Sequence, residues 1–197
     1  MAENKSINNS KNQILDAALE VFVKKGYSET RMDDIVKKSG LSKGAIYHHY
    51  KSKRDLFLSL IEHWEQFSFP NIFDKDLNKH TSSDILREIV RDIIKAFKKN
   101  KHVFLAELEF WSLANHDADV RDKTKILYVK LLHLFKNIIK KGIEKNEFKN
   151  IDLEIGSLSI MTSIQGIIWF SIFEESKLSA EKYLTEVIEF IIKGFEK

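Results

Sequence analysis

The chain contains no cysteine among its 197 residues, which excludes disulfide frameworks, zinc ribbons, iron–sulfur clusters and cysteine nucleophiles. It has one proline and seven glycines, too few turn-forming residues for a sandwich or barrel of many short strands. With 43% hydrophobic and 31% charged residues, it is too apolar for a disordered protein and long enough for one or two domains with real cores. These features favour an all-α fold.

Positive charge is concentrated near the N-terminus. Residues 1–55 hold eleven Lys and Arg against seven Asp and Glu, a net charge of +4, whereas the rest of the chain carries −1. A basic N-terminal quarter on a nearly neutral body indicates contact with a nucleic acid or an anionic membrane at one end, although a bias this small also fits a solvated surface.

No signal peptide is recognisable, because residues 1–10 are polar and carry no apolar core with a cleavage site, so we expect a cytoplasmic protein. The nineteen residues Ile155–Phe173 carry no formal charge and approach the length of a membrane span. They include four serines, a threonine, a glutamine and two glycines, without basic flanks. This composition favours a helix buried in a core and a subunit interface, and no membrane contact.

Helix starts are indicated by capping boxes, in which a Ser or Thr hydroxyl accepts a backbone N–H three residues later. The candidate boxes are Ser10 with Gln13, Thr30 with Asp33, Ser52 with Asp55, and Thr81 with Asp84. Glycine and proline mark ends and breaks: Gly26, Gly40 and Pro70 stop helices, and Gly142 ends or bends one. Apolar periodicity then predicts about nine helices, near residues 11–25, 31–38, 43–50, 53–67, 82–99, 102–115, 119–145, 152–173 and 180–195.

Residues 31–50 have the outline of a helix-turn-helix, with Gly40 in the turn. At 100° per residue, one side of the third helix gathers Ser42, Ala45, Ile46, His49 and Tyr50, and the other gathers Lys43, Gly44, Tyr47, His48 and Lys51. The second set combines cations, a phenol and an imidazole with a glycine that allows close approach. It predicts a DNA-facing surface for the major groove; an ordinary polar face is the alternative.

The sequence from Ile14 to Leu60 resembles the N-terminal domain of TetR (tetracycline-repressor-like) transcriptional regulators. The matching residues are Gly26-Tyr27, Thr30, Ile35, Gly40-Leu41-Ser42-Lys43-Gly44, Tyr47, His49-Tyr50, and Lys53 with Leu56. The departures from the family pattern are Arg31 for a second threonine, Val36 and Ser39 for alanines, and Tyr50 for phenylalanine.

The resemblance implies a helix-turn-helix DNA-binding domain at residues 1–52, a connecting helix at 53–67, and a helical ligand-binding and dimerisation domain at 68–197. It also implies phosphate contacts by Tyr47, His49 and Lys53, although the helical wheel places His49 nearer the buried side. Arg31 replaces a phosphate-binding hydroxyl by a charged donor. The resemblance further implies that Ser42, Lys43 and Gly44 approach base edges and that His48 is a variable specificity position.

The resemblance further implies a homodimer whose four-helix bundle is formed by Asp152–Phe173 and Ala180–Phe195. Their apolar surface exceeds what one neighbouring face of the same chain covers, which agrees with self-association; a larger monomeric core is the alternative. A twofold dimer requires an inverted-repeat operator. Release by a small lipophilic or aromatic effector is expected, and the residues proposed to contact it are Glu107, Phe110, Trp111, Tyr128, His133, Gln165 and Trp169.

Two other classes of function remain open at the level of the sequence. An enzyme is unmotivated, since the seven histidines form no His-Glu-x-x-His motif, Asp117-x-Asp119 lacks the rest of a calcium loop, and no phosphate-binding glycine loop occurs. We therefore expect no catalytic residue, metal or cofactor. A helical adaptor that binds protein partners shares the amphipathic helices, but its binding is far less sensitive to salt than DNA binding.

Overall fold

The computed structural model describes residues 2–69, 71–76, 80–173 and 177–197, with the side chains of residues 2–8 and 102 left aside. Pro70, which is predicted to break the fourth helix, lies outside the described residues. The regular secondary structure of the described residues is helical apart from one isolated bridge between Phe148 and Glu196. Its elements are α1 (Ala2–Glu29), α2 (Met32–Ser39), α3 (Lys43–His49), α4 (Lys53–Ser68), η1 (Ile72–Asp74), α5 (Ser82–Lys99), α6 (Lys101–Ala114), α7 (Ala118–Glu144), α8 (Leu153–Gln165), η2 (Gly166–Ile168), α9 (Trp169–Ile172) and α10 (Ala180–Phe195).

The chain divides into two compact units. The first comprises residues 1–67 and 105–124, and the second comprises residues 68–104 and 125–197. The sequence places a boundary at residue 68, and the contacts of the structure add the later part of α6 and the first turns of α7 to the N-terminal unit.

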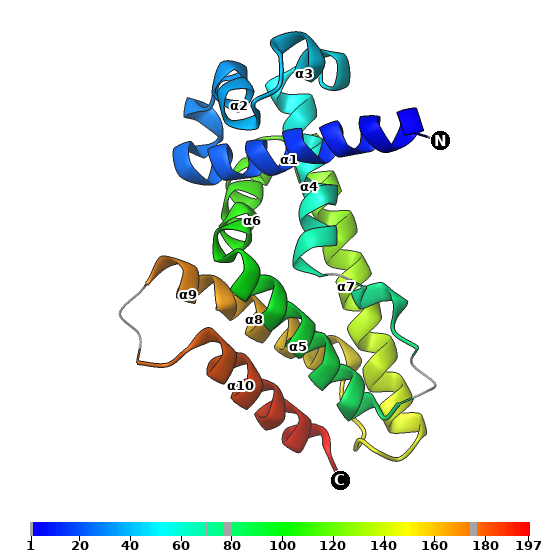
Figure 1. Ribbon diagram of the computed structural model, residues 1–197. Coiled ribbons are helices and arrows are strands. Elements are labelled where there is room, and N and C mark those ends of the chain that lie inside the picture. Colours follow the sequence, from blue (N-terminus) through cyan, green and yellow to red (C-terminus); the bar gives the residue numbers. More distant parts are fainter. Residues whose placement is uncertain (1, 70, 77–79, 174–176) are drawn as a thin grey trace. The chain divides into compact units, whose positions relative to one another are not determined.

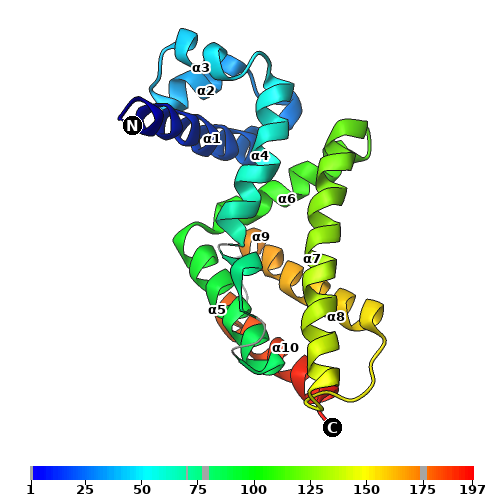
Figure 2. The same ribbon diagram turned by 90° about the vertical axis from the view of Figure 1, so that its right-hand side faces the viewer.

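In the first unit, α1, α2 and α3 gather at one end of α4 (Figures 1 and 2). Their shared core contains Leu19 and Phe22 of α1, Ile35 of α2, Ile46 of α3 and Leu56 of α4, all of which are buried. These residues recur at helical spacing, so each helix turns one apolar stripe inward, and burial of that stripe stabilises the unit.

Two of the four predicted capping boxes are wrong. Ser10 is not an N-cap, because α1 begins at Ala2, and no glycine or proline interrupts it before Gly26. Thr30 does not cap α2, because its hydroxyl donates to the carbonyl of Gly26 at 2.7 Å. The N-cap is Arg31, whose backbone N–H donates to Asp34 at 3.0 Å.

The other two caps and both glycine turns are confirmed. The N–H of Asp55 donates to the Ser52 hydroxyl at 3.0 Å, and that of Asp84 donates to Thr81 at 3.1 Å. Gly26 interrupts α1 with φ 76°, and Gly40 ends α2 with φ 70°. Glycine lacks the Cβ that makes such positive φ values costly for other residues.

In the second unit, α10 packs against both α5 and α8, and Figure 1 shows these three helices side by side. Ile89 and Ile93 of α5, Ile160 of α8, and Leu184 and Ile188 of α10 are buried in its core.

The uncharged run of residues 155–173 folds within α8, η2 and α9. Residues Leu153–Ile172 are long and apolar enough to cross a bilayer by length and composition. In the structure this segment buries Ile160 and Ile164 and packs against α10. It leaves Ile155 and Trp169 exposed.

Candidate nucleic-acid interface

The turn between α2 and α3 is held by the side chain of Ser39. Its hydroxyl donates to the carbonyl of Val36 at 3.1 Å and accepts the N–H of Leu41 at 3.3 Å. The amide of Gln13 in α1 donates to the Ser39 carbonyl at 2.8 Å. Serine here, in place of the alanine of the family pattern, supplies an acceptor for the Leu41 N–H and a second donor to the Val36 carbonyl, which also accepts the N–H of Gly40 at 3.1 Å.

The orientation of α3 is set by its N-cap and its buried face. The Ser42 hydroxyl accepts the N–H of Ala45 at 3.2 Å, which starts the helix. Ile46 and Tyr50 are buried, and His49 is half-buried. As the helical wheel predicts, the opposite side exposes Lys43, Gly44, Tyr47 and His48.

The exposed side of α3 carries a cation and an aromatic ring in contact. The ammonium of Lys43 lies 5.9 Å from the ring centroid of Tyr47, and the Tyr47 side chain is 41% exposed. Arg31, at the start of α2, is also exposed. Lys43 and Tyr47 on α3, together with Arg31 at the start of α2, provide exposed hydrogen-bond donors for phosphates and base edges.

Lys53 lies at the start of α4 and is engaged within the protein. Its ammonium donates to the carbonyls of Tyr27 at 2.7 Å and Ser28 at 3.2 Å, and it lies 4.5 Å from the Tyr27 ring centroid. It therefore ties the end of α1 to α4. A lysine ammonium has three N–H donors, of which these two carbonyls take two. The third N–H is available for the phosphate contact that the resemblance implies, and this contact stays a prediction.

Residues 105–124 are joined to α1 and α4 by contacts that the sequence does not predict. The guanidinium of Arg54 in α4 donates to Asp117 through Nε at 2.9 Å and Nη2 at 3.0 Å, and Nη2 also reaches Asp119. These hydrogen bonds from Arg54 hold the pKa of Asp117 below its usual value. The Glu109 carboxylate accepts the backbone N–H of Tyr27 at 3.1 Å. The Asp117-x-Asp119 pair is thus an arginine-binding element.

The residues proposed to contact an effector do not share one environment. Phe110 is buried, with its ring centroid 5.5 Å from that of Phe57 and 5.7 Å from that of Trp64. In the first unit, Glu107 is half-buried and Trp111 is exposed. In the second unit, Gln165 is half-buried, and the side chains of Tyr128, His133 and Trp169 are exposed.

The buried hydroxyl of Tyr50 has no hydrogen-bond partner among the described residues. The side chain is only 3% exposed, and burial raises its pKa to about 12. Replacing Tyr50 by the phenylalanine of the family pattern is expected to raise the free energy of unfolding by about 1 kcal/mol, because an unpaired buried polar group is removed.

Chemical denaturation at pH 7 and pH 11 tests this effect. Because burial raises the pKa of Tyr50 to about 12, the unfolded tyrosine ionises near pH 10 while the folded one does not, so the wild type loses stability as the pH rises from 10 toward 12. The gain of Tyr50→Phe is therefore larger at pH 11 than at pH 7. A variant that is less stable than the wild type at both values contradicts the assignment of an unpaired hydroxyl.

Comparison with known proteins places this geometry in a family. Residues 14–60 match the family described as bacterial regulatory proteins, tetR family. These residues contain the core of α1 and all of α2 and α3. The chain belongs to the TetR family. It is a DNA-binding transcriptional regulator and not an enzyme.

The likeness to this family extends beyond the matched segment. The fatty acid metabolism regulator protein of Bacillus subtilis is 23% identical over 185 residues, covering 92% of this chain and 93% of that protein. The HTH-type transcriptional regulator QacR of Staphylococcus aureus is 25% identical over 189 residues, covering 96% and 100%.

Solved structures of similar fold also span nearly the whole chain. The transcriptional regulator FadR from Bacillus subtilis, in complex with stearoyl-CoA, superposes with a TM-score of 0.77 at 23% identity, covering 93% of this chain and 98% of its own. A regulator from Saccharomonospora viridis in complex with choline gives 0.79 at 17% identity, covering 96% and 99%. The all-helical TetR fold is therefore shared along the chain, including the second unit.

Proposed function

We propose that this TetR-family regulator is a homodimeric repressor, acting in the cytoplasm, that binds an inverted-repeat operator and is released by a small lipophilic or aromatic molecule. The observation that supports operator binding is the exposed side of α3, with Lys43, Gly44, Tyr47 and His48 placed over the buried Ile46. A twofold dimer presents two such helices about one turn of DNA apart, so two half-sites in opposite orientation are contacted.

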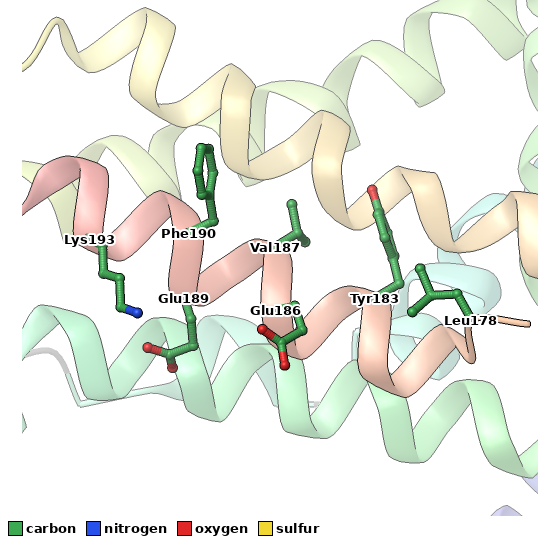
Figure 3. A pocket seen from close by; sticks show the side chains of 7 residues that line it. All are labelled: Leu178, Tyr183, Glu186, Val187, Glu189, Phe190 and Lys193. Carbon is green, nitrogen blue, oxygen red and sulfur yellow. The ribbon is translucent and has the colours of Figure 1, made fainter.

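Support for the dimer comes from the outer side of α10. Figure 3 shows Tyr183, Val187 and Phe190 pointing one way from this helix, while Glu186, Glu189 and Lys193 point the other way. All six line a shallow groove of about 430 Å³ together with Leu178. Phe190 is 79% exposed, and Tyr183 and Val187 are half-buried. A partly exposed apolar face next to a polar edge is the usual composition of a subunit interface.

The two sides of α10 have different partners within the chain. The Tyr183 hydroxyl donates to the carbonyl of Ser163 in α8 at 3.0 Å, whereas Glu189 accepts two hydrogen bonds from Arg87 of α5, the shorter at 2.6 Å. The apolar side of α10 therefore adjoins α8, whose Ile155 is 66% exposed. In the proposed dimer, α8 and α10 of one protomer pack against α8 and α10 of its partner, and the apolar surface of both helices is buried.

The test of operator binding is fluorescence anisotropy of the purified protein with the DNA upstream of its own gene, against a scrambled duplex, over a salt series. We expect preference for the upstream DNA and affinity that falls by orders of magnitude as salt rises. Equal and weak binding to both duplexes contradicts binding to its own upstream DNA, and salt-insensitive binding favours the protein adaptor.

Within this proposal, Tyr47 and Lys43 have separable roles. Tyr47→Phe removes a phosphate donor and is expected to weaken binding about tenfold on all sequences, whereas Lys43→Ala is expected to change which sequences are preferred. Competition binding with operator variants and a random duplex measures both the overall affinity and the sequence preference of each variant. A uniform loss of affinity in both variants contradicts base reading by Lys43.

For the effector, the similar regulators suggest two chemical classes to test first. The Bacillus subtilis regulator of similar fold holds stearoyl-CoA, and the Saccharomonospora viridis one holds choline. We expect a lipophilic molecule such as the long-chain acyl thioester to release the DNA by favouring the state with lower operator affinity. Each compound is titrated into the protein–DNA complex, and release by choline alone argues for a cationic effector.

A further inference from the structure

The side chain proposed to read bases is held by a carboxylate of the preceding helix. Lys43 at the start of α3 forms an ion pair with Asp33 in the first turn of α2, with 2.8 Å between Nζ and Oδ1. Both side chains are largely exposed, at 61% and 73%. The hydrogen bond from Lys43 to Asp33 raises the pKa of Lys43, so the ammonium remains charged.

Asp33 is not needed to start α2. The N-cap N–H of Arg31 is accepted by the neighbouring Asp34, which also pairs with Lys25 at 2.6 Å. Asp33 thus makes its ion pair with Lys43 while its neighbour satisfies the end of the helix. A carboxylate beside a DNA-binding cation is unfavourable near phosphates, since it repels them and competes for the cation.

The competition has different consequences on the two kinds of DNA. On a random sequence, affinity comes from phosphate contacts alone, and a lysine gains there only a general electrostatic interaction. On the operator, a lysine that donates to guanine O6 and N7 gains a directed interaction worth more than an exposed ion pair. Lys43 therefore leaves Asp33 on the operator, where the whole ion pair is lost, whereas on a random sequence it can stay paired. The Asp33 carboxylate thus lowers the affinity of the specific complex at least as much as that of the non-specific one.

We propose that Asp33 is an affinity-limiting residue of the recognition helix, which holds the Lys43 ammonium within the protein until a matching base edge displaces it. This inference rests on the proposed base contact of Lys43. Asp33 itself contacts no DNA in the specific complex, and it acts through the position and availability of the Lys43 ammonium.

The experiment compares the wild type with Asp33→Asn on two probes. The first is the duplex that the wild type selects from a random-sequence library, and the second is a scrambled duplex of the same length. Because the first probe comes from selection, the test does not depend on whether the protein binds its own upstream DNA. A wild type that selects no sequence contradicts the proposed operator, whereas the effect of Asp33→Asn on the scrambled duplex is still measured.

We expect Asp33→Asn to tighten binding to the selected duplex by up to about fivefold per recognition helix, the factor that corresponds to an exposed ion pair. Affinity for the scrambled duplex rises by the same factor or less, so the ratio of specific to non-specific affinity does not fall. The salt dependence on the scrambled duplex steepens by up to roughly one ion per helix, because Lys43 is then free to contact a phosphate. In the Lys43→Ala background, the same substitution has little effect on either duplex.

Glu20→Gln is the matched control. Glu20 of α1 forms an exposed ion pair with Lys38 of α2 in the same unit, so this variant changes the net charge equally without touching Lys43. An equal tightening in Glu20→Gln overturns the proposal and assigns the effect to net charge. A loss of affinity for the selected duplex alone in Asp33→Asn also overturns it, because Asp33 then contacts a base directly.

Discussion

Replacing Gly142 by alanine is expected to lower the free energy of unfolding by about 2 kcal/mol, although alanine at most helical glycines raises it by about 1. The reason is the ring of Phe148, which folds back over the last turn of α7. A Cβ at residue 142 lies 2.2 Å from Cδ2 and 2.6 Å from Cε2 of that ring. Ordinary contacts begin near 3.4 Å, so the ring must move.

The Phe148 ring has little freedom to move. It is 1% exposed, and its centroid lies 5.6 Å from that of Phe195 at the end of α10. The following residue, Lys149, donates its N–H to the Phe195 carbonyl at 2.8 Å. Displacing the ring therefore disturbs the contact between the end of α7 and the end of α10, and overpacking of this kind is not relieved by a surface rotamer.

Gly194 of α10 provides the matched control, because a Cβ there meets nothing within 4 Å. Gly194→Ala is expected to leave the protein as stable as the wild type or slightly more stable. Thermal unfolding at one fixed protein concentration measures both variants. Gly142→Ala with a melting temperature equal to that of Gly194→Ala contradicts the packing of Phe148 on Gly142.

Gly142 also shows what a sequence can and cannot predict here. Apolar periodicity predicts α7 to within a residue or two at each end, because a stripe at 3.6 spacing is the local signature of a helix that packs on one side. It favours Gly142 as an end or a bend, whereas the helix continues through Gly142 to Glu144. What occupies the space beside Gly142 is the ring that returns from residue 148, which is tertiary information.

The candidate DNA interface likewise has features that the sequence predicts and features that depend on tertiary contacts. The wheel correctly predicts which side of α3 is exposed, since Ile46 and Tyr50 are buried and Lys43 and Tyr47 are exposed. It does not predict the Asp33 ion pair or the use of Lys53 at the end of α1. Both involve long or flexible side chains whose partners lie ten or more positions away, and no local pattern encodes such pairs.

Aromatic residues at helical spacing are the least informative part of the sequence. The same pattern arises whether a ring fills a core or lines a pocket. Phe110 is packed against Phe57 and Trp64, and none of the seven proposed effector contacts lines the groove of α10 or the groove between α5 and α10. These seven residues therefore remain predictions.

Replacing Phe190 by glutamate is expected to convert the proposed dimer to a monomer and to weaken operator binding by at least about 100-fold. The Phe190 side chain is 79% exposed, so its loss costs the isolated chain little, whereas a carboxylate buried in an apolar interface is unfavourable. Two linked recognition helices gain affinity because the second binds at high effective concentration, and a monomer loses that gain. Analytical ultracentrifugation and anisotropy on the selected duplex measure the two effects.

Phe73→Glu separates this effect from the added charge. Phe73 of η1 is 41% exposed, and its ring centroid lies 5.9 Å from the ammonium of Lys130 in α7, a helix outside the proposed interface of α8 and α10. That variant is expected to remain a dimer and to bind the operator as the wild type does. A dimeric Phe190→Glu contradicts the α8 and α10 interface. A monomeric Phe190→Glu with unchanged operator affinity shows instead that one recognition helix is sufficient, because the linked second helix is then not what supplies the affinity.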